Sequence, residues 1–295
     1  MSEFPDWSRG LQAALDRLSI AAPRPAGGQR AGPVLSRSLG RALEFADYRA
    51  YTPGDDPKLV DWRAYNRLDR LFLKQFREER ARTIALLVDA SASLDFGDGR
   101  QHKGLYGRQL AAALAWIALG RMERVQTFVL RGSSALALPA PGTRTGAVML
   151  FRALEAVHEQ EPVSLEAAVR SALAQLRGSG PLFLISDLLD PEWPAALRLL
   201  AQREQHDVVL QVLAPEEWDP PLGDEVELQD SENGELRQTR FGPSELGEYR
   251  AQLGAFLHDI GDAARRLGLR HLALNTAEPV ADILLKRLPA AGILQ

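Results

Sequence analysis

The sequence contains no cysteine among its 295 residues. Disulfide bonds, thiolate metal sites and cysteine nucleophiles are therefore excluded, which is compatible with a reducing cytosol. Three nucleotide-binding or catalytic motifs are also missing: the G-x-x-x-x-G-K-[ST] phosphate loop, a complete dinucleotide-binding fingerprint, and the G-x-S-x-G elbow of serine hydrolases. These absences leave nucleotide binding and serine or cysteine hydrolysis without support.

Long apolar stretches are lacking as well. The longest, from Leu110 to Leu119, is well short of the roughly 20 residues that a helix needs to cross a bilayer. The segment from Met1 to Trp7 carries acids and no basic region, so it does not predict a signal peptide. We therefore expect a cytoplasmic protein without a membrane span.

A surplus of positive charge is also absent. The 35 basic residues stand against 39 acidic ones, a formal net charge of −4, which argues against nucleic acid as a partner. The five histidines show no metal-ligand spacing such as H-x-x-x-H, so no zinc site is expected. The least even segment runs from Pro215 to Glu235, with nine acids and no Lys or Arg.

What is present, from residue 83 onward, is an alternation of apolar strands and helices. Strands are predicted at 83–89, 125–130, 181–187, 207–213 and 270–274, and helices at 103–121, 145–159, 165–176, 194–203, 244–267 and 279–288. Strands separated by helices predict parallel βαβ units, hence a doubly wound, mainly parallel α/β sheet over 83–295. A hairpin insertion is expected near 224–240, around Asn233-Gly234.

The chain before this sheet divides in two. Residues 1–33 predict a short amphipathic helix, with Trp7, Leu11 and Leu18 on one face, followed by a linker rich in proline and glycine. Residues 34–82 form a strand-and-loop elaboration, with a strand expected over 71–76. Its many Arg, Asp, Tyr and Trp residues either pair in a rigid network or form a surface that docks a partner.

The strand at 83–89 leads into a loop lined with oxygen atoms. Asp89-Ala-Ser-Ala-Ser93 places one carboxylate and the hydroxyls of Ser91 and Ser93 on alternate residues, beyond the carboxyl end of a buried strand, where parallel sheets bind their ligands. Such oxygens suit a hard cation, Mg²⁺ or alternatively Mn²⁺, with water or a partner's carboxylate completing the shell. The alternative is a turn in which Asp89 and the serines only cap the next segment.

Two resemblances follow from these residues. The form D-x-S-x-S resembles the metal-ion-dependent adhesion site (MIDAS) of von Willebrand factor A domains. Five further motifs precede it in order: Gly40-x-x-x-Glu-Phe45, Tyr48-Arg-x-Tyr51, Pro53-Gly-Asp-Asp56, Val60-Asp-Trp62 and Glu78-Glu-Arg80. Together they resemble the bacterial domain-of-unknown-function fifty-eight family, which is similar to von Willebrand A domains and typically accompanies MoxR-type AAA+ ATPases.

The resemblance implies a fuller metal site. Asp187, at the end of a second buried strand beside the first, corresponds to the acid that acts on the ion through water. The family has a threonine where this chain has Val163, and Ser164, one residue later, either replaces that ligand or caps the next helix. The implied ligand set is Asp89, Ser91, Ser93, Asp187 and Ser164.

Three functions stay open on this evidence. The resemblance implies a non-enzymatic, chaperone-associated adaptor that works with a MoxR-type AAA+ ATPase and binds an acidic side chain of its partner through the cation. The first alternative is a metal-dependent hydrolase or phosphatase that uses the same pocket. The second is a structural adaptor with a vestigial metal site, which Val163 favours.

Overall fold

The computed structural model describes residues 4–5, 7–21, 43–52, 55, 60–62, 64–65, 70–78, 82–159, 162–203, 205–220, 223–229, 236–241 and 243–295. The chain divides into two compact units, Met1–Pro23 with Arg82–Gln295, and Arg24–Ala81. The linker predicted up to residue 33, the Asn233-Gly234 turn and parts of the five motifs lie outside the described residues.

The smaller unit contains an antiparallel pair of strands. β1 (Leu43–Ala50) pairs with β2 (Phe72–Glu78), and Val60 adds an isolated antiparallel bridge to Leu73. The strand predicted over 71–76 is confirmed as β2. The strand-and-loop character expected for this segment is therefore present in its described residues.

The larger unit is built on a six-stranded sheet of order β10-β7-β6-β3-β4-β5. The strands are β3 (Thr83–Asp89), β4 (Arg124–Arg131), β5 (Ser134–Ala137), β6 (Leu182–Ser186), β7 (Val208–Leu213) and β10 (Arg270–Asn275). All neighbours pair in parallel except β5, which is an antiparallel edge strand. Every residue of β3 is buried, because β3 is central and covered on both faces. The predicted doubly wound, mainly parallel sheet is confirmed.

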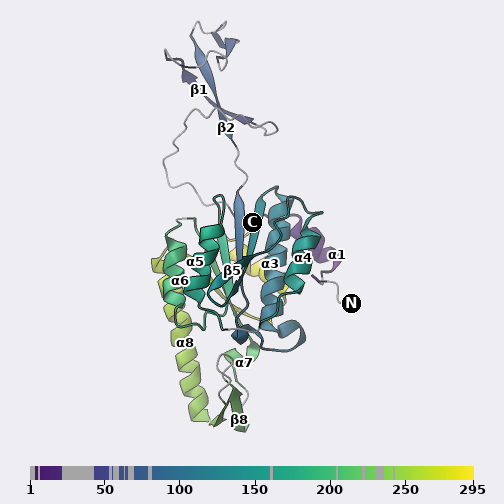
Figure 1. The fold of residues 1–295 in the computed structure, drawn as a ribbon, viewed down its shortest axis with the longest axis vertical. Coiled ribbons are helices and arrows are strands. Elements are labelled where there is room, and N and C mark those ends of the chain that lie inside the picture. Colours follow the sequence, from purple (N-terminus) through teal and green to yellow (C-terminus); the bar gives the residue numbers. More distant parts are fainter. Residues whose placement is uncertain are drawn as a thin grey trace. The chain divides into compact units, whose positions relative to one another are not determined.

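Helices cover both faces of this sheet (Figure 1). On one face lie α1 (Arg9–Leu15), α3 (Lys103–Gly120), α4 (Ala147–Glu155) and the C-terminal segment α9 (Val280–Asp282), η4 (Ile283–Arg287, a π-helix) and α10 (Leu288–Ala290). On the other lie α5 (Leu165–Gln175), α6 (Trp193–Ala201) and α8 (Pro243–Arg266). Side chains of β3 alternate between the two cores, with Leu86 in the first and Leu87 in the second. None of the helices in the described part of the chain is long and apolar enough to cross a bilayer.

Five short elements follow β3 and β7 in the chain. The loop after β3 contains the 3₁₀ turns η2 (Ala92–Leu94) and η3 (Gly99–Gln101). A single helical turn, α7 (Pro215–Trp218), follows β7. Next, β8 (Gly223–Gln229) and β9 (Leu236–Phe241) pair as antiparallel strands, which confirms the hairpin expected near 224–240.

The helix predicted over 145–159 is shorter than expected. It ends at Glu155, and the residues that follow turn toward α3, where the buried guanidinium group of Arg108 donates hydrogen bonds to the carbonyl of Val157 and to the carboxylate of Glu159. Val157 itself is buried against Ala90. These tertiary contacts outweigh the local helical preference of the segment.

The predicted N-terminal helix is confirmed as α1, which packs on the main sheet domain. The Trp7 ring stands edge-on to Trp116 and to Phe151, with ring centroids 6.2 and 5.6 Å apart. The indole nitrogen of Trp116 donates to Asp16 at 2.9 Å. Aromatic pairs of this geometry add to the stability gained by apolar burial, so this helix is part of the same core.

Gly180 allows the loop before β6 to pass close to the start of β3. Its φ is +145°, and a Cβ atom there would lie 2.6 Å from the carbonyl oxygen of Thr83. We expect Gly180→Ala to lower the free energy of unfolding by about 2–4 kcal/mol. The backbone conformation at this position is unfavourable for alanine, and the added Cβ atom would clash with the Thr83 carbonyl oxygen. The control is Gly132→Ala, where φ is +52° but a Cβ meets nothing within 4 Å. A loss of about 1 kcal/mol is expected there, and equal losses in urea denaturation would contradict the role of the contact.

Candidate functional site

Asp89 ends β3 and places its carboxylate at the carboxyl edge of the sheet. Oδ1 accepts a hydrogen bond from the backbone N–H of Ser91 at 2.9 Å, and Oδ2 accepts one from the hydroxyl of Ser186 at 2.6 Å. The residue is only 5% exposed. Burial, and after it the charge of Asp187, raises the pKa of Asp89 to about 7. Near neutral pH this carboxyl group therefore keeps a proton in part of the molecules, unless a cation takes the place of the proton.

The two serines of the loop have a spacing that suits a small cation. Ser91 Oγ and Ser93 Oγ lie 3.0 Å apart, and both side chains are buried. Neighbouring ligands of an octahedral Mg²⁺ ion lie about 3 Å apart, because each metal–oxygen bond is about 2.1 Å long. Together with Asp89, these hydroxyls fit one side of the coordination shell of a magnesium ion.

Asp187 lies next to this loop, as the sequence predicts. It follows β6, which pairs directly with β3, so the two acids stand at the ends of neighbouring strands. Asp187 Oδ1 accepts a hydrogen bond from the backbone N–H of Leu189 at 3.2 Å. Its other oxygen, Oδ2, is engaged by the ammonium group of Lys103 at 2.8 Å. The second acid of the predicted site therefore already has a cationic partner from the chain itself.

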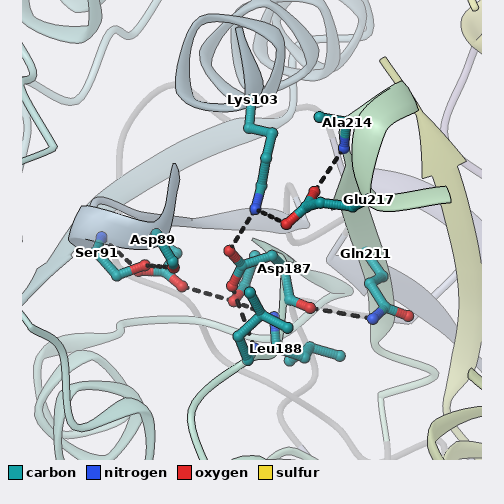
Figure 2. A network of polar contacts seen from close by, with 11 residues as sticks. Asp89, Ser91, Lys103, Asp187, Leu188, Gln211, Ala214 and Glu217 are labelled. Carbon is teal, nitrogen blue, oxygen red and sulfur yellow. Dashed lines mark hydrogen bonds and ion pairs between the residues drawn. The ribbon is translucent and has the colours of Figure 1, made fainter. Parts of the chain in front are cut away.

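Lys103 begins α3 and is fully buried. Its Nζ donates to Asp187 Oδ2 and, at 2.7 Å, to Oε1 of Glu217 (Figure 2). Burial lowers the pKa of Lys103, but the charges and hydrogen bonds of the two carboxylates outweigh this effect and raise it overall. The ammonium group thus stays charged, and it ties the start of α3 to the end of β6 and to α7.

Glu217 is held on both of its carboxylate oxygens. Oε1 accepts a hydrogen bond from the ammonium group of Lys103, and Oε2 accepts a hydrogen bond from the backbone N–H of Ala214 at 2.7 Å. Burial raises the pKa of Glu217, whereas Lys103 opposes that rise. The carboxylate therefore caps α7 and faces the same edge of the sheet as Asp89 and Asp187.

A hydrogen bond from the neighbouring strand β7 holds the backbone at Asp187 in place. Gln211, a fully buried residue of β7, donates from Nε2 to the carbonyl of Asp187 at 3.0 Å, and its Oε1 accepts from Nε2 of His271 at 2.9 Å. Burial lowers the pKa of His271 to about 4, so this ring is neutral at physiological pH. Leu188 has a φ of +60°, which is uncommon for a residue with a side chain.

Val163 and Ser164 are both engaged elsewhere. Val163 is buried in the apolar core beside α5. The hydroxyl of Ser164 donates to Glu192 at 2.6 Å, and the first backbone N–H of α5 is capped by Asp190 instead. Ser164 stands at the N-cap position without capping through its side chain. Its role as a metal ligand stays a prediction, and a metal there would have to replace the bond to Glu192.

A second group of ligand atoms lies in the described part of the chain, where Asp95, His102 and Glu159 approach within 4.8 Å of one another. His102 Nδ1 accepts the backbone N–H of Leu105 at 3.2 Å, so the proton resides on Nε2, which donates to Asp95 at 2.9 Å. A metal on Nε2 would move that proton to Nδ1 and break the cap of α3. Glu159 is already paired with Arg108. These contacts explain the group as a helix cap beside an ion pair.

Weak signals in the sequence point to some of the residues that surround the two acids. Lys103 is the only lysine in the alanine- and leucine-rich helix that it begins, and Gln211 is the only polar residue of β7. An isolated polar residue in a buried element usually has a specific partner. Glu217 carries no such signal, because it lies among other acids.

Comparisons with known proteins add the following findings. A family model described as "Protein of unknown function DUF58" matches residues 47–247. "Uncharacterized protein Mb1516" of Mycobacterium bovis and "Uncharacterized protein Rv1480" of Mycobacterium tuberculosis are each 30% identical to this chain over 280 residues, which is 92% of this chain and 87% of each relative. Among solved structures, the hypothetical protein BatB from Bacteroides thetaiotaomicron is 14% identical with a TM-score of 0.44, and the SpRpn10 VWA domain is 12% identical with a TM-score of 0.41. Each of these two matches covers 71% of this chain. The match covers 98% of the BatB chain and 96% of the SpRpn10 chain.

Proposed function

This chain belongs to the family described as "Protein of unknown function DUF58", and on that premise we propose that it is a cytoplasmic, non-enzymatic protein-binding module that works with a MoxR-type AAA+ ATPase. The recognition site in this proposal is the carboxyl edge of the sheet, at the loop Asp89–Ser93 and Asp187. The observation that carries the proposal is a group of buried carboxylates at an edge that also exposes apolar side chains.

The apolar side chains lie next to the acids in the sequence. Phe96, three residues beyond Ser93, is 44% exposed, and Leu189, two residues beyond Asp187, is 46% exposed. The ring of Phe96 lies 6.0 Å from Nζ of Lys103. Exposed aromatic and aliphatic residues around a desolvated polar centre are typical of protein interfaces.

The smaller unit supplies a second candidate docking surface. Trp62 is 58% exposed, and Tyr65 stands edge-on to it with ring centroids 6.2 Å apart. Large exposed aromatic residues favour the docking interpretation of the segment Tyr51–Trp62 over the rigid-network interpretation.

In the proposed mechanism, Mg²⁺ or Mn²⁺ binds Asp89, Ser91 and Ser93, and an acidic side chain of the partner completes the shell. Because the two hydroxyls are neutral, the bound ion keeps net positive charge and attracts a carboxylate. The 3.0 Å separation of the hydroxyl oxygens supports this donor set. Asp187 would act on the ion through water while it holds Lys103.

The proposal predicts an association that depends on the cation. The full chain should co-purify with the MoxR-type ATPase of its organism in the presence of Mg²⁺. Both EDTA and Asp89→Ala should reduce that association at least about tenfold, because each removes the charge that binds the partner. The control is Asp98→Ala, which changes an exposed acid whose side chain caps nothing in the same loop. Association that survives both EDTA and Asp89→Ala would contradict the metal-bridged mechanism.

The alternative is a metal-dependent hydrolase or phosphatase that uses the same cation pocket, in which the ion on Asp89, Ser91 and Ser93 would activate an attacking water molecule. Magnesium-dependent turnover of phosphoesters that is abolished by Asp89→Ala would favour the hydrolase instead.

A further inference from the structure

The proposed function does not use the buried ammonium group of Lys103, although this group lies between two carboxylates of the site. We infer that Lys103 is a resident cation that sets the affinity of this edge for divalent metal, and that Glu217 acts in the opposite direction. In this inference neither residue is a metal ligand. The inference deepens the proposed function and rests on its cation site.

The charges of the site are close enough to act on one another. Lys103 Nζ lies 2.8 Å from Asp187 and 2.7 Å from Glu217, and the charge of Asp187 acts on both Asp89 and Glu217 (Figure 2). Three carboxylates and one ammonium group give a formal charge of −2. A divalent cation would bring this charge to zero. Because Asp89, Asp187 and Lys103 are buried and Glu217 is partly buried, their mutual energies are larger than those of surface charges.

Lys103 is also held where it can compete with a metal ion. Its backbone N–H donates to the carbonyl of Phe96 at 2.9 Å, and its side chain has no exposed surface. The ammonium group engages Asp187 Oδ2 at 2.8 Å, so this oxygen is already paired with a cation of the chain itself. A metal ion would therefore be held by Asp89, Ser91 and Ser93, the donors that Lys103 does not engage.

The effects of Lys103 and Glu217 on metal affinity can be separated by substitutions that change the charge of the site and leave the metal ligands in place. Lys103→Met leaves a formal charge of −3, Glu217→Gln leaves −1, and the double variant returns to −2. The dissociation constant for Mn²⁺, measured by isothermal titration calorimetry at pH 8, should fall at least about tenfold in Lys103→Met and rise about tenfold in Glu217→Gln. In the double variant it should return to within about threefold of the wild-type value.

The opposite changes in the dissociation constant for Mn²⁺ distinguish this role from a purely structural one. If Lys103 and Glu217 only stabilise the fold, both single variants should weaken Mn²⁺ binding. Lys286→Met is the control, because Lys286 pairs with Asp282 on the exposed side of η4 and should leave the affinity unchanged. Circular dichroism establishes that each variant is folded. Should Lys103→Met not fold, Glu217→Gln still decides, and an unchanged or tighter Mn²⁺ affinity in that variant overturns the inference.

The result also separates this inference from the proposed function. Mn²⁺ binding that appears only in Lys103→Met would support the role of the lysine and remove the cation from the proposed function. An affinity that does not change in folded Lys103→Met, together with an ATPase association that EDTA still abolishes, would overturn the inference and leave the proposed function standing.

Discussion

Lys103→Met is expected to lower the free energy of unfolding by about 3–5 kcal/mol in metal-free buffer. Methionine has nearly the volume and length of lysine, so little packing is lost. What is lost is the charge between Asp187 and Glu217, whose carboxylates lie 2.8 and 2.7 Å from Nζ. A buried carboxylate without a cation is unfavourable, and here two would lie close together.

Urea denaturation in EDTA measures this loss, with Lys286→Met as the control. Lys286 Nζ also contacts a carboxylate, at 2.9 Å, but its side chain is 72% exposed, and a change within about 0.5 kcal/mol is expected. Adding Mn²⁺ should recover part of the stability of Lys103→Met, because an ion that binds only the folded state stabilises it. A loss no larger than that of Lys286→Met would contradict the buried ion pair.

Asp89→Asn is expected to act in the opposite direction and raise the free energy of unfolding by about 2–4 kcal/mol at pH 8. The pKa of Asp89 is raised from 3.8 to about 7, first by burial and then by Asp187. A raised pKa means that the folded state favours the protonated form of the Asp89 carboxyl group. The stability that this form provides is fully present below pH 3.8 and is lost as the pH rises to about 7. Asparagine cannot ionise, and its Oδ1 can still accept the Ser91 N–H.

The pH dependence tests this assignment. In EDTA, the difference in unfolding free energy between Asp89→Asn and wild type should be below about 1 kcal/mol at pH 4.5, grow up to about pH 7 and then stay constant. Asp187→Asn is the matched control, because it removes one of the two carboxylate partners of Lys103 and should destabilise the protein at both ends of this range. A destabilising Asp89→Asn at pH 8 would contradict the account. A stabilising one is typical of residues kept for function at the expense of stability.

Much of the fold follows from local patterns in the sequence. The uncharged run in β3 and the equally apolar β6 predict buried neighbouring strands, and the acids that end them, Asp89 and Asp187, then meet at one edge because parallel strands end on the same side. The sequence also shows that Val163 cannot be a ligand. These features depend on residue type and on position within one element.

The charges around the two acids depend on tertiary contacts instead. Lys103 and Glu217 are 114 residues apart, and a lysine at the start of a helix is ordinarily a surface residue. Only the packing of α3 and α7 over the end of β6 brings the two side chains together. In the same way, the position of Ser164 suits a ligand or a cap, but in the fold Asp190 caps α5 and Glu192 accepts the hydrogen bond of the Ser164 hydroxyl.

The most direct test of the central claim is the affinity of the MoxR-type ATPase for wild type and for Asp89→Asn, measured by biolayer interferometry with Mg²⁺ and with EDTA. Because Asp89→Asn is expected to be more stable than wild type, any weaker binding cannot come from unfolding. We expect wild type to bind in Mg²⁺ and to lose at least about tenfold in affinity in EDTA, and Asp89→Asn to bind at that lower level in both buffers. Equal affinity of the two proteins in Mg²⁺ would contradict recognition at this edge of the sheet.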